Sequence, residues 1–288
     1  MDFSVIIATY NRRELLQRVL LALRNQTLDP ERFEVIVVDD GSTDGTADAL
    51  ASSGLRVFSQ ANRGPAAARN LGLRHARGRW VVMTDDDTLP SPGWLESLEK
   101  AITQHPDWVG VEGRTVCPDP DPLGHWVENP RGRQYITANI AYRRDLLVEV
   151  GGLDESFPHP KCEDTELAWR CLQRGPIGFW PDMELSHPNR PQALSGLLTS
   201  ARYELSEFRL HRKLGNDYGK FRRFGHPWAV LALIYLIVPW VRAWRFRQQL
   251  RGKRGLLYAA VHGLRPLWFL YYLLRSRQDL DPRAGGST

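Results

Sequence analysis

Residues 33–46 read FEVIVVDDGSTDGT, and this stretch decides the fold class. Phe33–Val38 is a short run with apolar residues on both faces, and it ends abruptly in Asp39 and Asp40. A strand that is apolar on both faces must be covered on both sides, which is typical of parallel sheets in α/β proteins. The stretch therefore predicts an inner strand that leads into a polar loop.

The same pattern repeats before and after this stretch. Short apolar runs alternate with segments whose apolar residues recur at helical spacing. We expect strands at 3–8, 33–38, 55–59 and 80–84, and helices at 12–26, 43–51, 65–76 and 93–104. Four strand–helix units predict an α/β fold with a mostly parallel, doubly wound, Rossmann-like sheet flanked by helices, whose ligands bind at the carboxyl ends of the strands.

Polar residues gather where each predicted strand ends. A single cluster of this kind is most often a helix cap or a solvated turn. Four clusters at one edge of a parallel sheet instead predict a ligand-binding crevice. The clusters are Thr9-Tyr10-Asn11, Asp39-Asp40-Gly41-Ser42, Asn62-Arg63-Gly64 and Asp85-Asp86-Asp87.

The three adjacent aspartates favour a metal site. Alternate residues leaving a strand point the same way, so Asp85 and Asp87 can share one hard divalent cation, Mg²⁺ or Mn²⁺, with substrate phosphates. The alternative is a cluster that caps the helix near Pro92. The sequence contains no GxxxxGK[ST] loop and no GxGxxG after the first strand, which disfavours a P-loop nucleotidase and a dinucleotide oxidoreductase. The remaining interpretation is an enzyme that transfers a chemical group from a nucleotide.

Composition adds a cellular context. The 288 residues are 42% hydrophobic, enough to bury a full core, and the three cysteines are too few for a disulfide framework. No CxxC pair is present, so we expect reduced cysteines and no zinc site. The N-terminus enters an apolar run without a basic leader, so we expect a cytoplasmic protein.

Seven stretches, taken in order, resemble the family-2 inverting glycosyltransferases. They are Ser4–Asn11 (SVIIATYN), Val37–Thr46 (VVDDGSTDGT), Asn62–Asn70 (NRGPAAARN), Thr84–Asp87 (TDDD), Thr137–Asn139 (TAN), Gly152–Phe157 (GLDESF) and Glu163–Leu167 (EDTEL). The resemblance spans about residues 3–190, and Thr9 stands where family members often have a proline. It implies a GT-A fold, with a nucleotide-sugar half at 1–110 and an acceptor and catalytic half at 111–195, before a helical region at 196–288.

The resemblance also implies roles for single residues. The donor is then a nucleotide sugar, expected to carry UDP, with Tyr10 against the base and Asp40 or Asp39 at the base edge. Nucleotide contacts are implied for Thr9, Tyr10, Asn11, Asp39, Asp40, Arg69, Asp85 and Asp86. Metal ligands are implied for Asp85, Asp87 and His187, although a lone histidine is as often a turn residue.

Inverting transfer needs a base for the acceptor hydroxyl. The resemblance makes Asp164 that base and Glu163 a positioning residue, and neighbouring carboxylates raise a pKa by repulsion. The same acids also suit a plain helix N-terminus. For the acceptor we expect contacts from Asn139, Trp126 and Arg170, with ordinary packing as the alternative for Trp126.

Two other classes of function share parts of this pattern. A non-catalytic nucleotide-sugar scaffold would be expected to lack the base or the metal aspartates, and this chain retains Asp85, Asp87 and Asp164. A nucleotidyltransferase would be expected to carry a Gly-rich, basic loop after its first strand, where this chain has Thr9–Arg13 without glycine. Both alternatives are therefore disfavoured.

The C-terminal region has a charge of its own. Residues 1–208 carry a net charge of −8 and residues 209–278 carry +14. Cations interleaved with apolar runs favour an anionic membrane surface over nucleic acid. Pro227–Val241 and Gly255–Leu274 fall short of an uninterrupted span of about 20 apolar residues. We expect these two segments to be interfacial or re-entrant helices. They would hold the protein peripherally or monotopically at the cytoplasmic face of the membrane, near a glycan or lipid-linked acceptor. The alternative is a soluble helical subdomain or a dimer interface.

Overall fold

The computed structural model describes residues 1–51, 54–157, 159–222 and 225–275. The chain divides into two compact units, which are described separately. The first unit comprises Met1–Pro118, Val127–Glu155 and Glu163–Pro188, and the second comprises Asp119–Trp126, Ser156–Cys162 and the residues from Asn189 onward.

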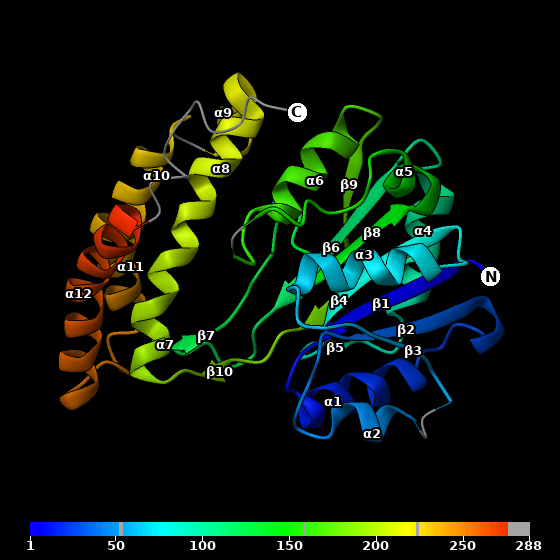
Figure 1. Ribbon diagram of the computed structural model, residues 1–288, viewed down its shortest axis with the longest axis horizontal. Helices are drawn as coiled ribbons and strands as arrows, with labels where there is room; N and C mark the ends of the chain where they lie inside the picture. The colour runs from blue at the N-terminus through cyan, green and yellow to red at the C-terminus, as the bar shows by residue number, and fades with distance from the viewer. Residues whose placement is uncertain (52–53, 158, 223–224, 276–288) are drawn as a thin grey trace. The chain divides into compact units, whose positions relative to one another are not determined.

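The first unit is built on an eight-stranded mixed sheet (Figure 1). Its strand order is β3-β2-β1-β4-β8-β6-β9-β5, in which β3, β2, β1 and β4 run parallel. Strand β8 pairs antiparallel with β4 and β6, and the short β5 pairs antiparallel with β9. The strands are β1 Phe3–Thr9, β2 Phe33–Asp39, β3 Arg56–Ser59, β4 Trp80–Asp85, β5 Leu89–Pro90, β6 Gly110–Val116, β8 Asn139–Arg143 and β9 Ile177–Ser186.

Helices cover this sheet because the inner strands are apolar on both faces. Phe3, Val5 and Ile7 of β1 pack into one core with Leu16 and Leu23 of the first helix. Ile6 faces the other side, where α3 approaches so closely that a Cβ at Gly72 would lie 2.6 Å from Ile6 Cγ2. The helices of this unit are α1 Arg13–Arg24, α2 Thr46–Ala51, α3 Pro65–His75, α4 Trp94–Gln104, α5 Arg144–Glu149 and α6 Glu163–Leu172, with a 3₁₀ turn at Pro30–Arg32.

The four predicted strand–helix units are confirmed, with boundaries within about three residues. The register brings their strand ends to one edge, because Thr9 lies opposite Asp39 and Ala8 lies opposite Asp85. Asp39 in turn lies opposite Ser59 of β3. The polar residues that follow these strands therefore share one edge of the sheet, as expected.

The second unit is mainly helical. Its small core contains Ala201, Leu205, Leu231, Phe269 and Leu273. Its elements are a strand pair, β7 Gly124–His125 with β10 Arg190–Pro191, then α7 Leu194–Thr199, 3₁₀ turns at Ser200–Glu204 and Gly215–Asp217, α8 Leu205–Leu214, α9 Tyr218–Phe221, α10 Pro227–Ala232, a π-helical turn Leu233–Ile237, α11 Val238–Arg245 and α12 Lys253–Arg275.

One apolar helix in this unit is longer than the sequence suggested. From α10 through the π-helical turn into α11, Pro227–Arg245 forms 19 helical residues with a mean hydropathy of 1.5, long and apolar enough to cross a membrane by length and composition alone. The expectation that this run is too short is therefore wrong. Pro239 removes a helical hydrogen bond, but the π-helical turn lies directly before it, and such a turn accommodates a proline without ending the helix.

Candidate active site

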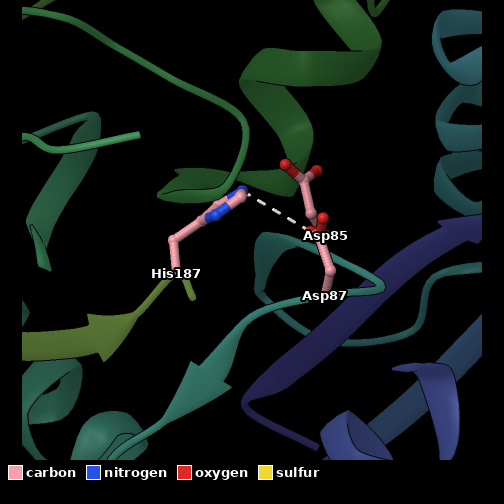
Figure 2. Close-up of side chains that lie close together, drawn as sticks. All are labelled: Asp85, Asp87 and His187. Carbon is pink, nitrogen blue, oxygen red and sulfur yellow. Dashed lines mark ion pairs between the residues drawn. The ribbon is translucent and has the colours of Figure 1, made fainter. Parts of the chain in front are cut away.

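Three side chains from distant parts of the chain converge beyond the ends of the parallel strands. Asp85, Asp87 and His187 each offer a ligand atom, and these atoms all lie within 4.8 Å of one another. Asp87 and His187 are buried, and Nε2 of His187 is 3.5 Å from Oδ1 of Asp87. Figure 2 shows the imidazole directed toward the two carboxylates. The two alternate aspartates and the histidine, which is distant from them in the sequence, thus lie together at one site.

Strand pairing explains how His187 reaches this point. Leu89 of β5, two residues after Asp87, lies opposite Ser186 of β9 in an antiparallel pair. The residue that follows Ser186 must therefore come alongside the aspartate turn. The backbone N–H of His187 also donates to the carbonyl of Val116, which fixes the chain at this place.

The donor set suits a small divalent cation. Two carboxylate oxygens and one imidazole nitrogen bind Mn²⁺ well and leave positions for phosphate oxygens and water. An octahedral ion with ligands at about 2.1 Å needs neighbouring ligand atoms roughly 3 Å apart and opposite ones about 4 Å apart. The spacing within 4.8 Å fits after small side-chain adjustments.

The middle aspartate of the triplet faces other partners. Thr9 Oγ1 donates to Asp86 at 2.8 Å, and Arg12 donates to the second oxygen of Asp86 at 2.7 Å. Burial is the main cause that raises the pKa of Asp86, and the charge of Asp87 raises it further. The charge of Arg12 lowers this pKa but does not outweigh the other two effects. Arg12 also lies 3.8 Å from Asp87. Sequence reasoning missed Arg12, although its place directly after the first strand end could have indicated it.

Asp85 is held by a buried cation. Arg69 of α3 donates to Asp85 at 2.6 Å, and its side chain is only 7% exposed. Burial by itself raises the pKa of Asp85, but the charges of Arg69, His187 and Arg12 outweigh it and lower the pKa below the usual value. Asp85 is therefore ionised, as a metal ligand must be.

The residues expected at the nucleotide line the loops after β1 and β2. Tyr10 is 46% exposed. Asn11 has φ of +53°, and its side-chain oxygen accepts from the backbone N–H of Thr43, which joins the two loops. Asp39 is buried and accepts from the N–H of Ser42.

Asp40 has a structural task in addition to the one expected for it. One carboxylate oxygen accepts from Gln60 and from the N–H of Arg63, and the other accepts from the N–H of Gly64. These bonds hold the loop before α3, the helix that carries Arg69. A contact of Asp40 or Asp39 with a base edge stays a prediction.

The acidic pair at the start of α6 consists of two unlike carboxyl groups. Glu163 is buried and has a carboxyl oxygen without a hydrogen-bond partner among the described residues. Burial, and next the charge of Asp164, raises the pKa of Glu163 to about 8. Asp164 is more exposed and accepts from the N–H of Thr165 at 2.7 Å. Burial, with repulsion by Asp164 as the second cause, therefore favours the protonated form of Glu163 at neutral pH.

Asn139 makes its side-chain hydrogen bonds inside the fold. It is fully buried, and its amide nitrogen donates to the carbonyls of Arg114 and Met183 while its oxygen accepts from the indole of Trp94. Because both amide hydrogens are used inside the fold, we assign Asn139 to joining β8, β6 and β9. The acceptor contact expected for Asn139 from the sequence stays a prediction.

Arg170 and Trp126 also have partners within their own units. Arg170 binds Glu166 at 2.7 Å and donates to the carbonyls of Val150 and Gly152, so it clamps the loop after α5. Trp126 belongs to the second unit, where the guanidinium of Arg242 lies 5.2 Å from its ring centroid. Acceptor contacts of Arg170 and Trp126 stay predictions.

The mixed sheet with four parallel strands and an Asp-x-Asp turn beyond their ends defines a fold class, the proteins of GT-A fold. The family model described as "Glycosyl transferase family 2" matches residues 4–153, slightly more than half of the chain. The chain therefore belongs to glycosyl transferase family 2. The matched segment includes the aspartate triplet and ends before Glu163 and His187.

Named relatives and solved structures agree with this membership. Validoxylamine A glucosyltransferase from Streptomyces hygroscopicus subsp. limoneus is 44% identical over 60% of this chain and 48% of its own. Glycosyltransferase AglE from Haloferax volcanii is 29% identical over 65% of this chain and 67% of its own. The chain thus spans about half to two thirds of the length of these relatives.

Two solved structures share the fold at lower identity. The mannosyltransferase PcManGT from Pyrobaculum calidifontis, in complex with GDP-Man and Mn²⁺, superposes with a TM-score of 0.62 at 22% identity, over 98% of this chain and 88% of that one. S. aureus TarS in complex with UDP-GlcNAc gives a TM-score of 0.59 at 20% identity, over 96% of this chain and 92% of that one.

Proposed function

We propose that this protein is an inverting glycosyltransferase that moves a sugar from a nucleoside diphosphate, UDP by preference, to a hydroxyl of a glycan or lipid-linked acceptor. The observation that carries the proposal is the convergence of Asp85, Asp87 and His187 at the strand ends. Structures of the same fold hold UDP-GlcNAc in one case and GDP-Man with Mn²⁺ in another, which supports a nucleotide-sugar donor.

The donor is bound by the loops after the parallel strands. The exposed ring of Tyr10 lies against the base, and Asp39 or Asp40 accepts a hydrogen bond from the base edge. Arg69 faces the diphosphate, whose charge would compete with Asp85 for the guanidinium. Asp85, Asp87 and His187 would hold Mn²⁺ or Mg²⁺, which when bound neutralises charge on the departing diphosphate.

Transfer is a single in-line displacement. The acceptor oxygen forms a bond to the anomeric carbon while the bond from that carbon to the diphosphate breaks, and its electron pair leaves with the diphosphate. The hydroxyl proton passes to the carboxylate of Asp164, which is the more exposed member of the acidic pair. Protonated Glu163 can donate a hydrogen bond that orients the acceptor. The anomeric configuration is inverted.

We further propose that the second unit binds an anionic membrane, peripherally or monotopically at the cytoplasmic face. Trp240 and Trp244 are 77% and 72% exposed on α11, and cations at 245, 247, 251, 253 and 254 follow directly. Exposed tryptophans beside cations are typical of helices that lie in a membrane interface. A helix of this length can also cross a membrane, but Arg242 and Arg245 within its last turn favour the interface.

A donor panel with metal control tests the catalytic proposal. Purified protein is incubated with UDP-, GDP- and dTDP-sugars, and hydrolysis of each is measured with EDTA, Mn²⁺ or Mg²⁺. We expect turnover of one nucleotide class, loss of turnover with EDTA and recovery with Mn²⁺ or Mg²⁺. Turnover at the full rate in EDTA would contradict the metal-assisted reaction.

A further inference from the structure

The second unit contains a half-buried arginine that has no anionic partner. Arg242 on α11 makes no ion pair and no hydrogen bond to any residue that the structure describes. Its guanidinium instead lies 5.2 Å from the ring centroid of Trp126, and that of Arg245 lies 5.5 Å from the same ring. A poorly hydrated cation without a counter-ion is costly to keep in a fold.

A second helix adds another under-paired cation. Arg265 on α12 has a buried Nε without a hydrogen-bond partner among the described residues. Its nearest carboxylate oxygen, on Glu204, is 3.6 Å away, and Lys161 binds the other oxygen of Glu204. Among the residues that the structure describes, Arg242 and Arg265 therefore share one carboxylate at most.

Arg242 and Arg265 both lie near His262 of α12. Burial, and then the charges of Arg265 and Arg242, lowers the pKa of His262 to about 4, so this histidine is neutral at pH 7. Some other basic residues of the unit do have close carboxylate partners, since Arg222 binds Glu207 at 2.9 Å and Arg254 binds both oxygens of Asp121. Arg242 has no such carboxylate among the described residues, and Arg265 has only the shared Glu204.

We propose that Arg242, Arg265 and Arg245, with Trp126 as a stacking surface, form a binding site for the phosphate group of an anionic membrane lipid. Guanidinium groups bind phosphate through two parallel hydrogen bonds, which an unpaired, pre-positioned arginine can supply at once. This inference rests on the membrane placement proposed above and is separate from the transfer chemistry.

The geometry of α11 favours a lipid phosphate over a free one. Trp240 and Trp244 lie four residues apart on one exposed face, and Arg242, midway between them, lies on the opposite face. When the tryptophans enter the boundary between headgroups and acyl chains, the opposite face of the helix lies among the headgroup phosphates. The site is then at the depth where lipid phosphates are found.

Lipid selectivity tests this site. The full chain is mixed with phosphatidylcholine vesicles that contain either phosphatidylglycerol or the phosphate-free cholesteryl hemisuccinate, adjusted to equal surface potential, and binding is measured by flotation. We expect about fivefold or greater preference for phosphatidylglycerol, since a carboxylate lacks the phosphate geometry. Arg242→Lys keeps the charge but should lose most of this preference, whereas the matched exposed control Arg251→Lys should keep it.

Each other outcome counts against the site. Equal binding to both vesicles, or equal loss of preference in both variants, would mean diffuse charge attraction. Stabilisation of the wild type against heat by inorganic phosphate without vesicles, lost in Arg242→Lys, would assign the site to free phosphate and overturn the lipid source. Absence of vesicle binding would overturn both site and membrane placement, whereas the donor panel would be unaffected. Thermal unfolding of Arg242→Gln checks the fold, which should weaken by no more than the loss of the contact with Trp126, because no anionic partner is lost.

Discussion

Nε2 of His187 lies 3.5 Å from Oδ1 of Asp87, although one hundred residues separate them in the chain. The contact exists because β5 and β9 pair antiparallel directly beside both residues. A local backbone arrangement thus completes a ligand set that the aspartate turn alone cannot supply.

The first prediction concerns Asp87. Asp87→Ala removes one metal ligand and relieves repulsion among buried carboxylates, so we expect metal-dependent hydrolysis of the donor to fall by at least about 100-fold while the fold is kept. Mn²⁺ binding, measured by calorimetry, should weaken in parallel, with an unchanged melting temperature in EDTA. The exposed carboxylate of Asp107 provides a matched control, and Asp107→Ala should behave as the wild type.

The second prediction separates the base from donor binding. Asp164→Asn removes the proton acceptor, so transfer to an acceptor should fall by about 100- to 10,000-fold. Donor affinity should change by less than about threefold, because the base acts on the acceptor hydroxyl. The measurement is single-turnover transfer beside donor binding by calorimetry. A variant that retains half of the activity would move the role of base to another residue.

The third prediction follows from the raised pKa of Glu163, about 8 in the folded protein. Between the unfolded pKa near 4.5 and the folded pKa, the unfolded chain ionises first, so stability falls as pH rises through this window. Glu163→Gln cannot ionise and should remove this loss. In EDTA the variant should melt several degrees above the wild type at pH 8, a gain of about 1–3 kcal/mol, and by a clearly smaller margin at pH 5.5.

Thermal unfolding at several pH values in EDTA provides the measurement for Glu163. Glu99→Gln, which alters a more exposed carboxylate of the same unit, is the control and should show no growing difference with pH. If the Glu163→Gln variant kept a constant offset from pH 5.5 to 8, the carboxyl group would not titrate in this window.

Much of this architecture could be predicted from the sequence, because it depends on patterns between residues that are close in the chain. Strands β1 to β4 and helices α1 to α4 follow from apolar periodicity, and Asp85 and Asp87 follow from alternation along a strand. The antiparallel pairing of β8 and β5 could not be predicted, because a two-residue strand carries no periodicity and pairing partners are distant in sequence.

Side-chain partners were the harder part of the site. Asn139 lies in a motif shared with the family, and only the structure shows that Trp94, Arg114 and Met183 use its amide group. Arg12 binds Asp86 from the turn after β1, a contact that requires the register of β1 beside β4. The sequence motifs thus located the loops at the candidate site. They could not show which side chains contact a substrate and which bind other residues of the protein.

The fourth prediction tests whether Arg170 is structural. Glu166 is only 3% exposed in its side chain, so Arg170→Met would leave a buried carboxylate without its cation and should cost about 2–4 kcal/mol of stability. The double variant Glu166→Gln with Arg170→Met should recover part of this loss. Denaturant unfolding measures both. If Arg170→Met left the stability unchanged, Arg170 would not be a structural residue, and contact with the acceptor would again be its expected role.

The last prediction concerns the exposed tryptophans of α11. Trp240→Ser with Trp244→Ser removes two large side chains that are 77% and 72% exposed, so little packing is lost and the melting temperature should stay within about 2 °C. Each tryptophan would bury a large apolar area in a membrane interface, so binding to phosphatidylglycerol vesicles should weaken by at least about tenfold. Leu21→Ser with Val148→Ser removes two apolar side chains of the first unit, each 60% exposed, and should not change vesicle binding. Because the tryptophan variant keeps every cation of the second unit, equal vesicle binding by both double variants would mean that charge alone holds the protein at the membrane and that α11 does not enter the interface.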